Sequence, residues 1–322
     1  MNNRVIALSG GIGGAKLALG LAKVLDADEL VVVANTGDDF EHLGFTICPD
    51  TDTLLYTLGG VSNEAAGWGR ADESWSFMEA LKQSDPDNAW FLLGDKDLET
   101  HRYRTQALAN GSKLTEITAN LASEFKVAPA ILPMSDDPVR TFVLAENETG
   151  TSWLPFQEYF VKLQCEPRML KVEYRGSQQA GVSPQLKQAL TEHVPRAIVI
   201  CPSNPFLSVD PILSVPGMVD LLRGCGAPVI AVSPVVGGQA LKGPTAKIMQ
   251  ELGMTVDVTA IAEHYRGIID GLVIDGQDRG QIVPVQETGI KAMVTNTVMV
   301  SLEDRKQLAR DVLRFASSVE RA

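Results

Sequence analysis

The chain contains few cysteines, few histidines and no long hydrophobic run. Its 322 residues include four cysteines and four histidines. The cysteines form no Cys-x-x-Cys pair and the histidines no closely spaced pair, so the sequence predicts neither a zinc knuckle nor a histidine metal motif. No stretch reaches the roughly 18 consecutive apolar residues of a membrane-spanning helix. The first residues enter a predicted strand without a basic and then apolar leader, so we expect a cytoplasmic protein with free thiols and no membrane partner.

Positive charge is scarce as well. Lys and Arg number 28 against 40 Asp and Glu, which gives a formal net charge of −12. A surface that binds nucleic acid needs clustered Lys and Arg, so we expect no nucleic-acid partner. For the same reason, an anionic substrate would need a local positive site or a metal ion. The sequence also has no Gly-x-Ser-x-Gly nucleophile motif, and this absence favours group transfer between two bound substrates over a covalent enzyme intermediate.

The first forty residues predict a strand, a glycine turn, a helix and a second strand. An apolar strand at 5–8 leads into Ser-Gly-Gly-Ile-Gly-Gly-Ala-Lys, and leucines then recur at helical spacing before a strand at 30–34. Glycine has no Cβ, so such a turn lets backbone N–H groups at the helix N-terminus face an anion. The candidate phosphate-binding residues of this turn are Gly10, Gly11, Gly13, Gly14 and Lys16.

This turn differs from the two best-known phosphate-binding motifs. It lacks the Gly-Lys-Ser/Thr ending of a P-loop, and its glycines do not reproduce Gly-x-Gly-x-x-Gly. Asn35, rather than Asp or Glu, follows the second strand, so a nicotinamide cofactor is not favoured. A phosphate-bearing ligand is the functional hypothesis, and the alternative is an ordinary tight turn in an α/β protein.

Apolar runs alternate with helical patterns along most of the chain. The runs that predict strands are 5–8, 30–34, 90–93, 127–132, 197–201, 229–233, 271–274 and 293–300. Strands that alternate with helices predict an α/β fold with a Rossmann-like, doubly wound, mostly parallel sheet. We expect residues 1–50 and 126–322 to form this nucleotide-binding core, with 51–125 as a mainly helical insertion that forms part of an acceptor site. Residues 168–174 alternate in polarity, which predicts an antiparallel strand.

Polar clusters follow six of the predicted strands. They contain Ser, Asn, Asp, Gly and Pro, and they lie at 9–11, 35–39, 94–97, 133–138, 202–205 and 234–238. In open α/β sheets ligands bind outside the carboxyl ends of the strands, so the clusters predict one active-site rim. The alternative is that these residue types merely form turns. His101 lies close to the third cluster and is the one histidine that we retain as a candidate.

Two carboxylates, Asp50 and Asp52, stand at the start of an apolar helical pattern. Asp50 alone could act as the N-cap of that helix. Together, two carboxylates two residues apart could hold Mg²⁺ beside substrate phosphates. Both interpretations stay open at this point.

Seven short motifs follow one another in an order that resembles the CofD family, the 2-phospho-L-lactate transferases of coenzyme F-420 biosynthesis. They span nearly the whole chain and lie at 9–17, 35–39, 48–53, 94–98, 132–139, 202–205 and 233–237. The Met-Ser-Asp-Asp-Pro-Val and Gly-Asp-Lys-Asp-Leu strings are far more specific than the glycine turn. A similar glycine turn occurs in the YvcK-like regulatory proteins, which bind a nucleotide sugar, and a protein of that kind is the alternative.

The resemblance implies a reaction and its site. Family members transfer a phospho-acid from a guanosine diphospho-linked donor to the ribityl hydroxyl of the deazaflavin Fo, release GMP and require Mg²⁺. On this resemblance Asp50 and Lys96 contact Fo, Asp50 orients or deprotonates the hydroxyl, and Asp52 joins Asp50 near the metal. The residues expected on the guanosine diphosphate side are Gly10, Gly11, Gly13, Gly14, Lys16, Ser135, Asp136, Asp137, Ser203, Asn204 and Gly237. A homodimer is also implied.

The chain departs from the family pattern at two places. Many relatives read Gly-Gly-Thr-Gly-Thr-Pro-Lys at the first turn, whereas this chain has Ile12, Gly14 and Ala15 and lacks two hydroxyl groups there. Lys96 stands where many relatives have Arg, which keeps the charge but loses the planar bidentate fork. The sequence does not choose among phospholactate, phosphoenolpyruvate and phosphoglycerate, because a few atoms of pocket shape distinguish them.

Overall fold

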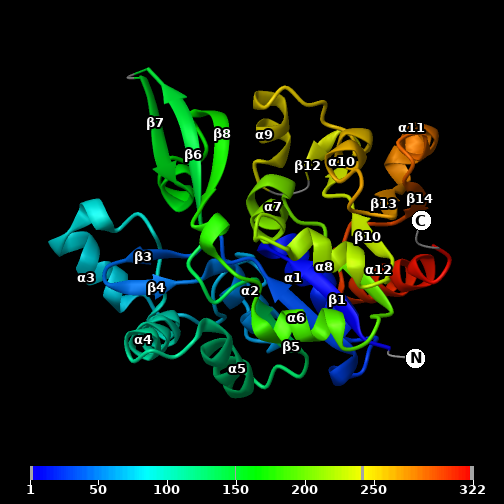
Figure 1. Cartoon of the computed structure of the whole chain (residues 1–322). Coiled ribbons are helices and arrows are strands. Elements are labelled where there is room, and N and C mark those ends of the chain that lie inside the picture. Colours follow the sequence, from blue (N-terminus) through cyan, green and yellow to red (C-terminus); the bar gives the residue numbers. More distant parts are fainter. Residues whose placement is uncertain (1–2, 149, 241–242, 320–322) are drawn as a thin grey trace.

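Seven parallel strands form one central sheet in the computed structural model, which describes residues 3–148, 150–240 and 243–319 (Figure 1). In spatial order the strands are β14 (Lys291–Thr295), β13 (Gly271–Asp275), β10 (Val229–Val232), β9 (Ala197–Ile200), β1 (Val5–Ser9), β2 (Leu30–Ala34) and β5 (Ala130–Pro133). Every neighbouring pair is parallel. The predicted α/β, doubly wound sheet is therefore confirmed. The strand order reverses beside β1, and open sheets bind ligands at such a switch point.

Helices cover both faces of the sheet because each buried strand sends alternate side chains to opposite sides. Val5 and Ala7 of β1 enter one core, whereas Ile6 and Leu8 enter the other. The helices that fill the Val5 core are α1 (Gly11–Ala22), α2 (Pro49–Leu58), α5 (Leu114–Glu124) and α12 (Leu302–Ala316). The opposite core is filled from α6 (Pro184–Thr191), α7 (Asp210–Leu213), α8 (Met218–Gly224), α9 (Thr245–Glu251), α10 (Val258–His264) and α11 (Ile282–Glu287).

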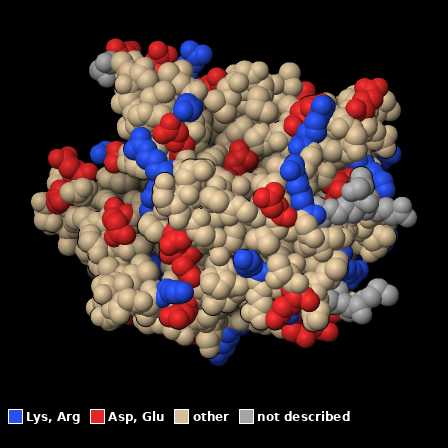
Figure 2. All heavy atoms as spheres, in the orientation of Figure 1, with Lys and Arg blue, Asp and Glu red and all other residues tan. Residues whose placement is uncertain are grey.

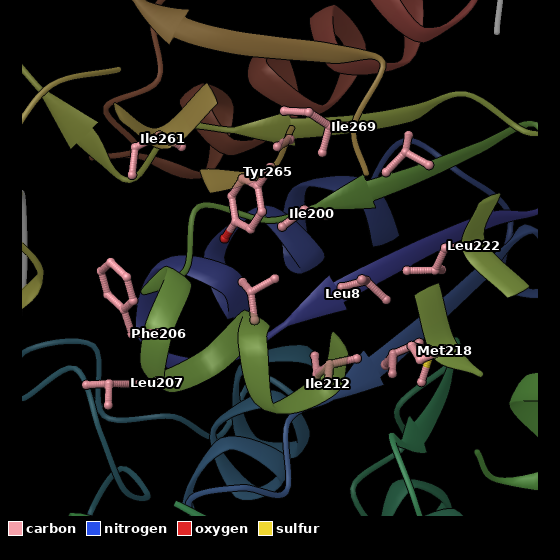
Figure 3. Close-up of a cluster of buried hydrophobic side chains, with 14 of the residues drawn as sticks. Leu8, Ile200, Phe206, Leu207, Ile212, Met218, Leu222, Ile261, Tyr265 and Ile269 are labelled. Atoms are coloured by element: carbon pink, nitrogen blue, oxygen red, sulfur yellow. The ribbon is translucent and has the colours of Figure 1, made fainter. Parts of the chain in front are cut away.

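The core on the Leu8 side anchors the segment that follows β9. Leu8 and Ile200 belong to the same buried cluster as Phe206 and Tyr265, which come from the segment after β9 and the end of α10 (Figure 3). All four side chains are at most 6% exposed. Burial of one such side chain contributes roughly 1.5–3 kcal/mol. The candidate site residues that directly follow β9 are therefore attached to a well-packed part of the molecule.

A three-stranded antiparallel sheet, which we call the arm, stands beside the central sheet at the top of the view in Figure 1. It consists of β7 (Gly150–Pro155), β6 (Arg140–Asn147) and β8 (Arg168–Arg175), in that order. The strand predicted at 168–174 is thus confirmed. Val143 and Ala145 of β6 are buried in the main core, whereas Phe142 and Leu144 on its other face are only partly buried.

Residues 51–125 are mainly helical, as predicted. Besides α2 and α5 they contain α3 (Ser76–Ser84) and α4 (Asp95–Ala109), and a hairpin of β3 (Phe40–His42) and β4 (Phe45–Ile47) packs beside them. The strand predicted at 90–93 is wrong, because these residues form a turn and an irregular stretch. Phe91 and Leu93 instead enter a small separate cluster with Met78. The strand predicted at 293–300 ends early, at Thr295. The division of the chain at 50 and 126 stays a prediction.

Acidic and basic side chains are interspersed over the face of the molecule drawn in Figure 2. Among the described residues, no single helix is long and apolar enough to cross a bilayer, and Pro205–Leu213 with Met218–Gly224 reach that composition only as a pair bent by 80°. All four cysteines are free thiols, and three of them are buried.

Candidate active site

The glycine turn after β1 is joined to the start of α2. α1 begins at Gly11, whose amide donates a hydrogen bond to Oδ1 of Asp50 at 2.7 Å. Asp50 lies in the first turn of α2, and the N-cap residue of that helix is Cys48, whose side chain makes no capping bond. The interpretation of Asp50 as the cap of its own helix is therefore wrong. Its carboxylate instead connects α2 to the N-terminus of α1, where the helix dipole stabilises negative charge.

Two buried carboxyl groups, those of Asp38 and Asp50, lie beside this turn, and the buried Asp39 follows Asp38 in the chain; we call the three the acidic cluster. Each is at most 8% exposed. Nδ2 of Asn35 donates to Oδ2 of Asp50 at 2.8 Å and to Oδ1 of Asp38 at 3.1 Å, so one amide joins two of the carboxyl groups. Asn35 is itself fixed, because its Oδ1 accepts a hydrogen bond from the amide of Gly37 at 2.8 Å.

Burial determines the charge of the acidic cluster. It raises the pKa of Asp50 to about 6, although hydrogen bonds from Asn35 and a glycine-turn amide act in the opposite direction. It raises the pKa of Asp38 well above its usual value, and the nearby charge of Asp50 adds to the effect. Burial also raises the pKa of Asp39 to about 7, against the favourable charge of Arg140. With a pKa of about 6, Asp50 is therefore ionised at neutral pH, beside a second carboxyl group whose pKa burial also raises.

The acidic cluster offers oxygen ligands of the kind that Mg²⁺ prefers. Oδ1 of Asp39 is buried and has no hydrogen-bond partner within the described ranges. Over the same part of the chain, no group of three or more His, Cys, Asp or Glu side chains is arranged to hold a metal ion. The donor set therefore fits a cation that shares one or two carboxylates with substrate phosphates, which is how Mg²⁺ commonly binds.

Asp52 has a different partner. Both of its oxygens accept hydrogen bonds from the guanidinium of Arg104 on α4, including one at 3.1 Å from Nη1 to Oδ2. Nδ1 of His101 lies 3.6 Å from the same carboxylate, and burial lowers the pKa of this imidazole to about 4. Positions two residues apart on a helix lie about 200° apart around its axis, so Asp50 and Asp52 face different sides of α2. The structure joins Asp50 to Asp38, and it pairs Asp52 with Arg104 instead.

The two lysines expected at the site donate to backbone carbonyl groups. Nζ of Lys96 lies 3.4 Å from the carbonyl oxygen of Ala71, and the Lys96 amide donates to Glu73 at 2.8 Å. Nζ of Lys16 donates to the carbonyl oxygen of Met299 at 3.1 Å. Because 90–93 is not a strand, the polar cluster that contains Lys96 does not mark a strand end, as was predicted, but begins α4.

Ser203 and the glycine turn are in direct contact. Oγ of Ser203 accepts a hydrogen bond from the amide of Gly10 at 3.3 Å. A Cβ at Gly13 would lie 2.4 Å from the carbonyl oxygen of Pro202, so no side chain fits there. The next residue, Asn204, accepts hydrogen bonds from the amides of residues 206 and 207 and so shapes the segment after β9. Two of the expected nucleotide-side segments therefore meet at the carboxyl ends of β1 and β9.

Four further candidates make hydrogen bonds within loops at the same edge of the sheet. Asp136 accepts from an amide at the start of α5, and Asp137 accepts from an amide in the loop before α6. Ser135 donates to a carbonyl oxygen of that second loop, and the amide of Gly237 donates to Asp278. These bonds stabilise the loops after β5 and β10. A contact of these four residues with a nucleotide stays a prediction.

Sequence reasoning missed several participants. Asn35 and Asp38 belong to a cluster that was chosen for its position after β2, but neither was assigned a role. Their signal is the Asn-Thr-Gly-Asp-Asp string, because Asn and Asp that directly follow a buried strand lie at the ligand edge of the sheet. The sequence gives no comparable sign of Arg104, because its ion pair with Asp52 depends on how α4 packs against α2.

The chain is similar to known proteins over almost its whole length. A protein-family model described as 2-phospho-L-lactate transferase CofD matches residues 5–316. The chain belongs to the CofD family. The phosphoenolpyruvate transferase of Streptomyces griseus subsp. griseus is 37% identical over 317 residues, which cover 98% of this chain and 99% of the relative. The 2-phospho-L-lactate transferase of Methanosarcina mazei is 36% identical over 310 residues, which cover 96% and 99% of the two chains.

The fold is also shared with a solved structure. A crystal structure of a UPF0052 family protein from Bacillus halodurans superposes with a TM-score of 0.61 at 14% sequence identity, covering 97% of this chain and 99% of that one. At this identity the likeness shows the fold alone. The family resemblance read from the sequence is confirmed by the family match, and the α/β architecture by the shared fold.

Proposed function

We propose that this chain transfers a phospho-acid from a guanosine diphospho-linked donor to the ribityl hydroxyl of the deazaflavin Fo and releases GMP. The CofD family membership and the names of the relatives support a transferase of the 2-phospho-L-lactate transferase type. The observation that carries the proposal is the hydrogen bond between Gly11 and Asp50, which joins a phosphate-type turn to a buried base. The identities of the acceptor and of the leaving group rest on the resemblance.

Asp50 is suited to activate the acceptor hydroxyl. With a pKa of about 6 it is ionised at neutral pH, and hydrogen bonds from Gly11 and Asn35 fix its orientation. In the proposed step the hydroxyl oxygen forms a bond to the phosphorus that carries the acid, its proton moves to Asp50, and the bond to the GMP oxygen breaks. Amides of the glycine turn and the N-terminus of α1 stabilise the negative charge of the diphosphate.

We propose Mg²⁺ as the cofactor of this reaction. Asp50 is the residue that would hold it beside the phosphates, and the unpartnered Oδ1 of the buried Asp39 is a further candidate oxygen. When bound, the cation would supply positive charge beside the phosphate oxygens. Lys96 is proposed to contact Fo from the start of α4, and a homodimer is proposed on the family resemblance.

Two phospho-acids are candidates for the transferred group. The Streptomyces relative, a phosphoenolpyruvate transferase, and the Methanosarcina relative, a 2-phospho-L-lactate transferase, are 37% and 36% identical to this chain. A difference of one percentage point does not choose between them, so the experiment supplies both donors.

Incubation with Fo, Mg²⁺ and either guanosine diphospho-linked acid, followed by mass spectrometry, tests the proposal. The expected products are GMP and Fo that has gained the phospho-acid as a phosphodiester, in equal amounts. A thermal-shift comparison provides the contrast with the regulatory alternative. Stabilisation by a nucleotide sugar, with no response to Fo and no product, would contradict the transferase.

A further inference from the structure

The base of the arm places two arginines opposite one another. Arg140, the first residue of β6, pairs in register with Arg175, the last residue of β8. Directly opposite side chains share a face, about 4.5–5.5 Å apart at Cβ, and like charges in that position destabilise a sheet. Within the ranges that the structure describes, Arg140 has no acidic partner within 4.0 Å, and Arg175 reaches only Glu173, at 3.8 Å. The sheet therefore carries two opposed arginines with one weak ion pair between them, to a Glu173 that Lys171 also contacts at 2.9 Å.

This arginine pair lies beside the acidic cluster. The amide of Thr141 donates to the carbonyl oxygen of Gly37 at 2.7 Å, which puts residue 140 next to the loop that carries Asp38 and Asp39. The start of β6, with Arg140, is thus at the edge of the proposed reaction site, and Arg175 lies opposite it in the sheet.

Arg175 is held by aromatic rings on the same face of the arm. Its guanidinium carbon lies 3.8 Å from the ring centroid of Phe142 and 5.2 Å from that of Trp153. Contact with aromatic faces orients a guanidinium and leaves its in-plane N–H groups available as donors. The two ring contacts therefore orient the Arg175 guanidinium so that its N–H groups can bind a planar anion.

Arg104, a further cation near the site, is paired with Asp52. Nη1 of Arg140 donates to the carbonyl oxygen of Val139 at 2.9 Å, as Lys16 and Lys96 donate to backbone carbonyl groups, but a guanidinium has four further N–H donors. In a chain with a net charge of −12, an anionic donor needs a local positive site. We propose that Arg140 and Arg175 bind the carboxylate of the phospho-acid part of the donor. This inference rests on the proposed function and adds the group that recognises the acid.

The diphosphate has donors of its own in the glycine turn, whose backbone amides face phosphate oxygens. The arginines are therefore left for the other anionic group of the donor, its carboxylate, which a guanidinium binds through two parallel hydrogen bonds. The acids named in the relatives, phosphoenolpyruvate and 2-phospho-L-lactate, both have a carboxylate on the carbon that bears the phosphate oxygen. A site for that carboxylate accepts this class of acid and excludes phosphate esters that lack it.

The test compares Arg140→Gln and Arg175→Gln with Arg168→Gln. Arg168 is the matched control, because it lies on β8 and forms an exposed ion pair with Glu146 at the far end of the arm. Calorimetry on the full chain measures the Kd of phosphoenolpyruvate, 2-phospho-L-lactate, GDP and Fo. We expect the Kd of both acids to rise about tenfold in the two test variants, which corresponds to about 1.4 kcal/mol. The Kd of GDP and Fo stays unchanged, and in turnover the KM of the donor rises while the KM of Fo does not.

Several results would overturn this assignment. Unchanged affinity for both acids in the test variants rejects it, as does failure of the unsubstituted chain to bind either acid. Equal weakening of GDP would assign the arginines to the diphosphate instead. If a Gln variant has a lower Tm than the unsubstituted chain, the corresponding Lys variant replaces it. Because Lys keeps the charge but lacks the fork, we expect a smaller loss of acid affinity in the same direction.

Turnover separates this inference from the proposed function. Product formation by the unsubstituted chain, with an unchanged donor KM in Arg140→Gln and Arg175→Gln, rejects the carboxylate site alone. No product from the unsubstituted chain, with acid binding that is lost in both variants, rejects the transfer to Fo and leaves the anion site in place.

Discussion

Replacement of Asp50 by Asn removes the proposed base while keeping nearly the same shape. In the native chain Oδ1 and Oδ2 accept hydrogen bonds from Gly11 and Asn35 at 2.7 and 2.8 Å. An Asn amide provides only one acceptor oxygen, so one of these two donors must face an NH₂ group. We expect kcat to fall by about 10² to 10⁴, which is the usual contribution of a general base.

The stability of Asp50→Asn distinguishes lost chemistry from a lost fold. Because burial raises the pKa of Asp50 from 3.8 to about 6, the folded chain binds this proton more tightly than the unfolded chain. The resulting stabilisation is present below about pH 4 and is lost as the pH rises to 6, by roughly 3 kcal/mol. The variant avoids that loss but leaves a donor unsatisfied, at a cost of about 1–3 kcal/mol. Its free energy of unfolding at pH 7 therefore stays within about 2 kcal/mol of the native value.

The pH dependence of turnover completes this test. For the native chain kcat/KM should rise about tenfold per pH unit below pH 6 and level off above it, whereas Asp50→Asn should lose this dependence. Asp28→Asn, an exposed position just before the amino end of β2 and so at the opposite edge of the sheet from the site, is the control and should behave as native. Urea titration at pH 7 measures the stability. Native-like turnover by Asp50→Asn, or a native profile that is flat from pH 5 to 7, would refute the assignment of the base.

Further expected outcomes concern the pair at Asp52, the glycine turn, the cation and the oligomer. Arg104→Leu leaves Asp52 buried without its guanidinium partner and should lower the free energy of unfolding by about 3–5 kcal/mol in urea titration; an unchanged value would contradict the buried ion pair. Gly13→Ala places a Cβ 2.4 Å from a backbone oxygen and should raise the Kd of GDP about tenfold in calorimetry, whereas Gly280→Ala, which points into open space, should not. Chelation with EDTA should abolish product formation in the mass-spectrometric assay, and added Mg²⁺ should restore it; full activity in EDTA would reject the cation. Light scattering should give twice the chain mass of 34.7 kDa, and a mass of one chain would reject the homodimer.

The central sheet could be predicted because its strands are short, continuous apolar runs that are buried on both faces. The run at 90–93 is similarly apolar, but its side chains fill a small cluster beside α3. Composition alone does not distinguish a strand of the central sheet from a loop that packs into such a cluster. β6 was missed for a related reason. Phe142 and Leu144 on its partly exposed face are as apolar as Val143 on the buried face, so the strand has no period-two polarity pattern.

The sequence could nominate individual residues for the candidate site, but it could not predict which side chains they contact. Asp50 was a candidate because it stands at the start of a helix at the ligand edge of the sheet, and the structure shows that its carboxylate bonds to Gly11 rather than capping that helix. Its connection to Asp38 through Asn35 depends on the distance between two loops, which no spacing in the sequence encodes. The pairing of Asp50 with Asp52 could have been doubted from the sequence, because positions two apart on a helix point about 200° apart.

The glycine turn retains hydroxyl groups despite its departure from the family pattern. A Cβ at Gly14 would lie 2.5 Å from Oγ of Ser9 and 2.6 Å from Oγ of Ser203, so a threonine at this position would clash with both. Oγ of Ser203 accepts from the amide of Gly10, whereas Oγ of Ser9 is buried without a hydrogen-bond partner in the described part of the chain. Since a buried hydroxyl without a partner costs free energy, a ligand oxygen beside this turn would satisfy it. Ser9 and Ser203 thus place two hydroxyl groups against Gly14, in a turn that has none of its own.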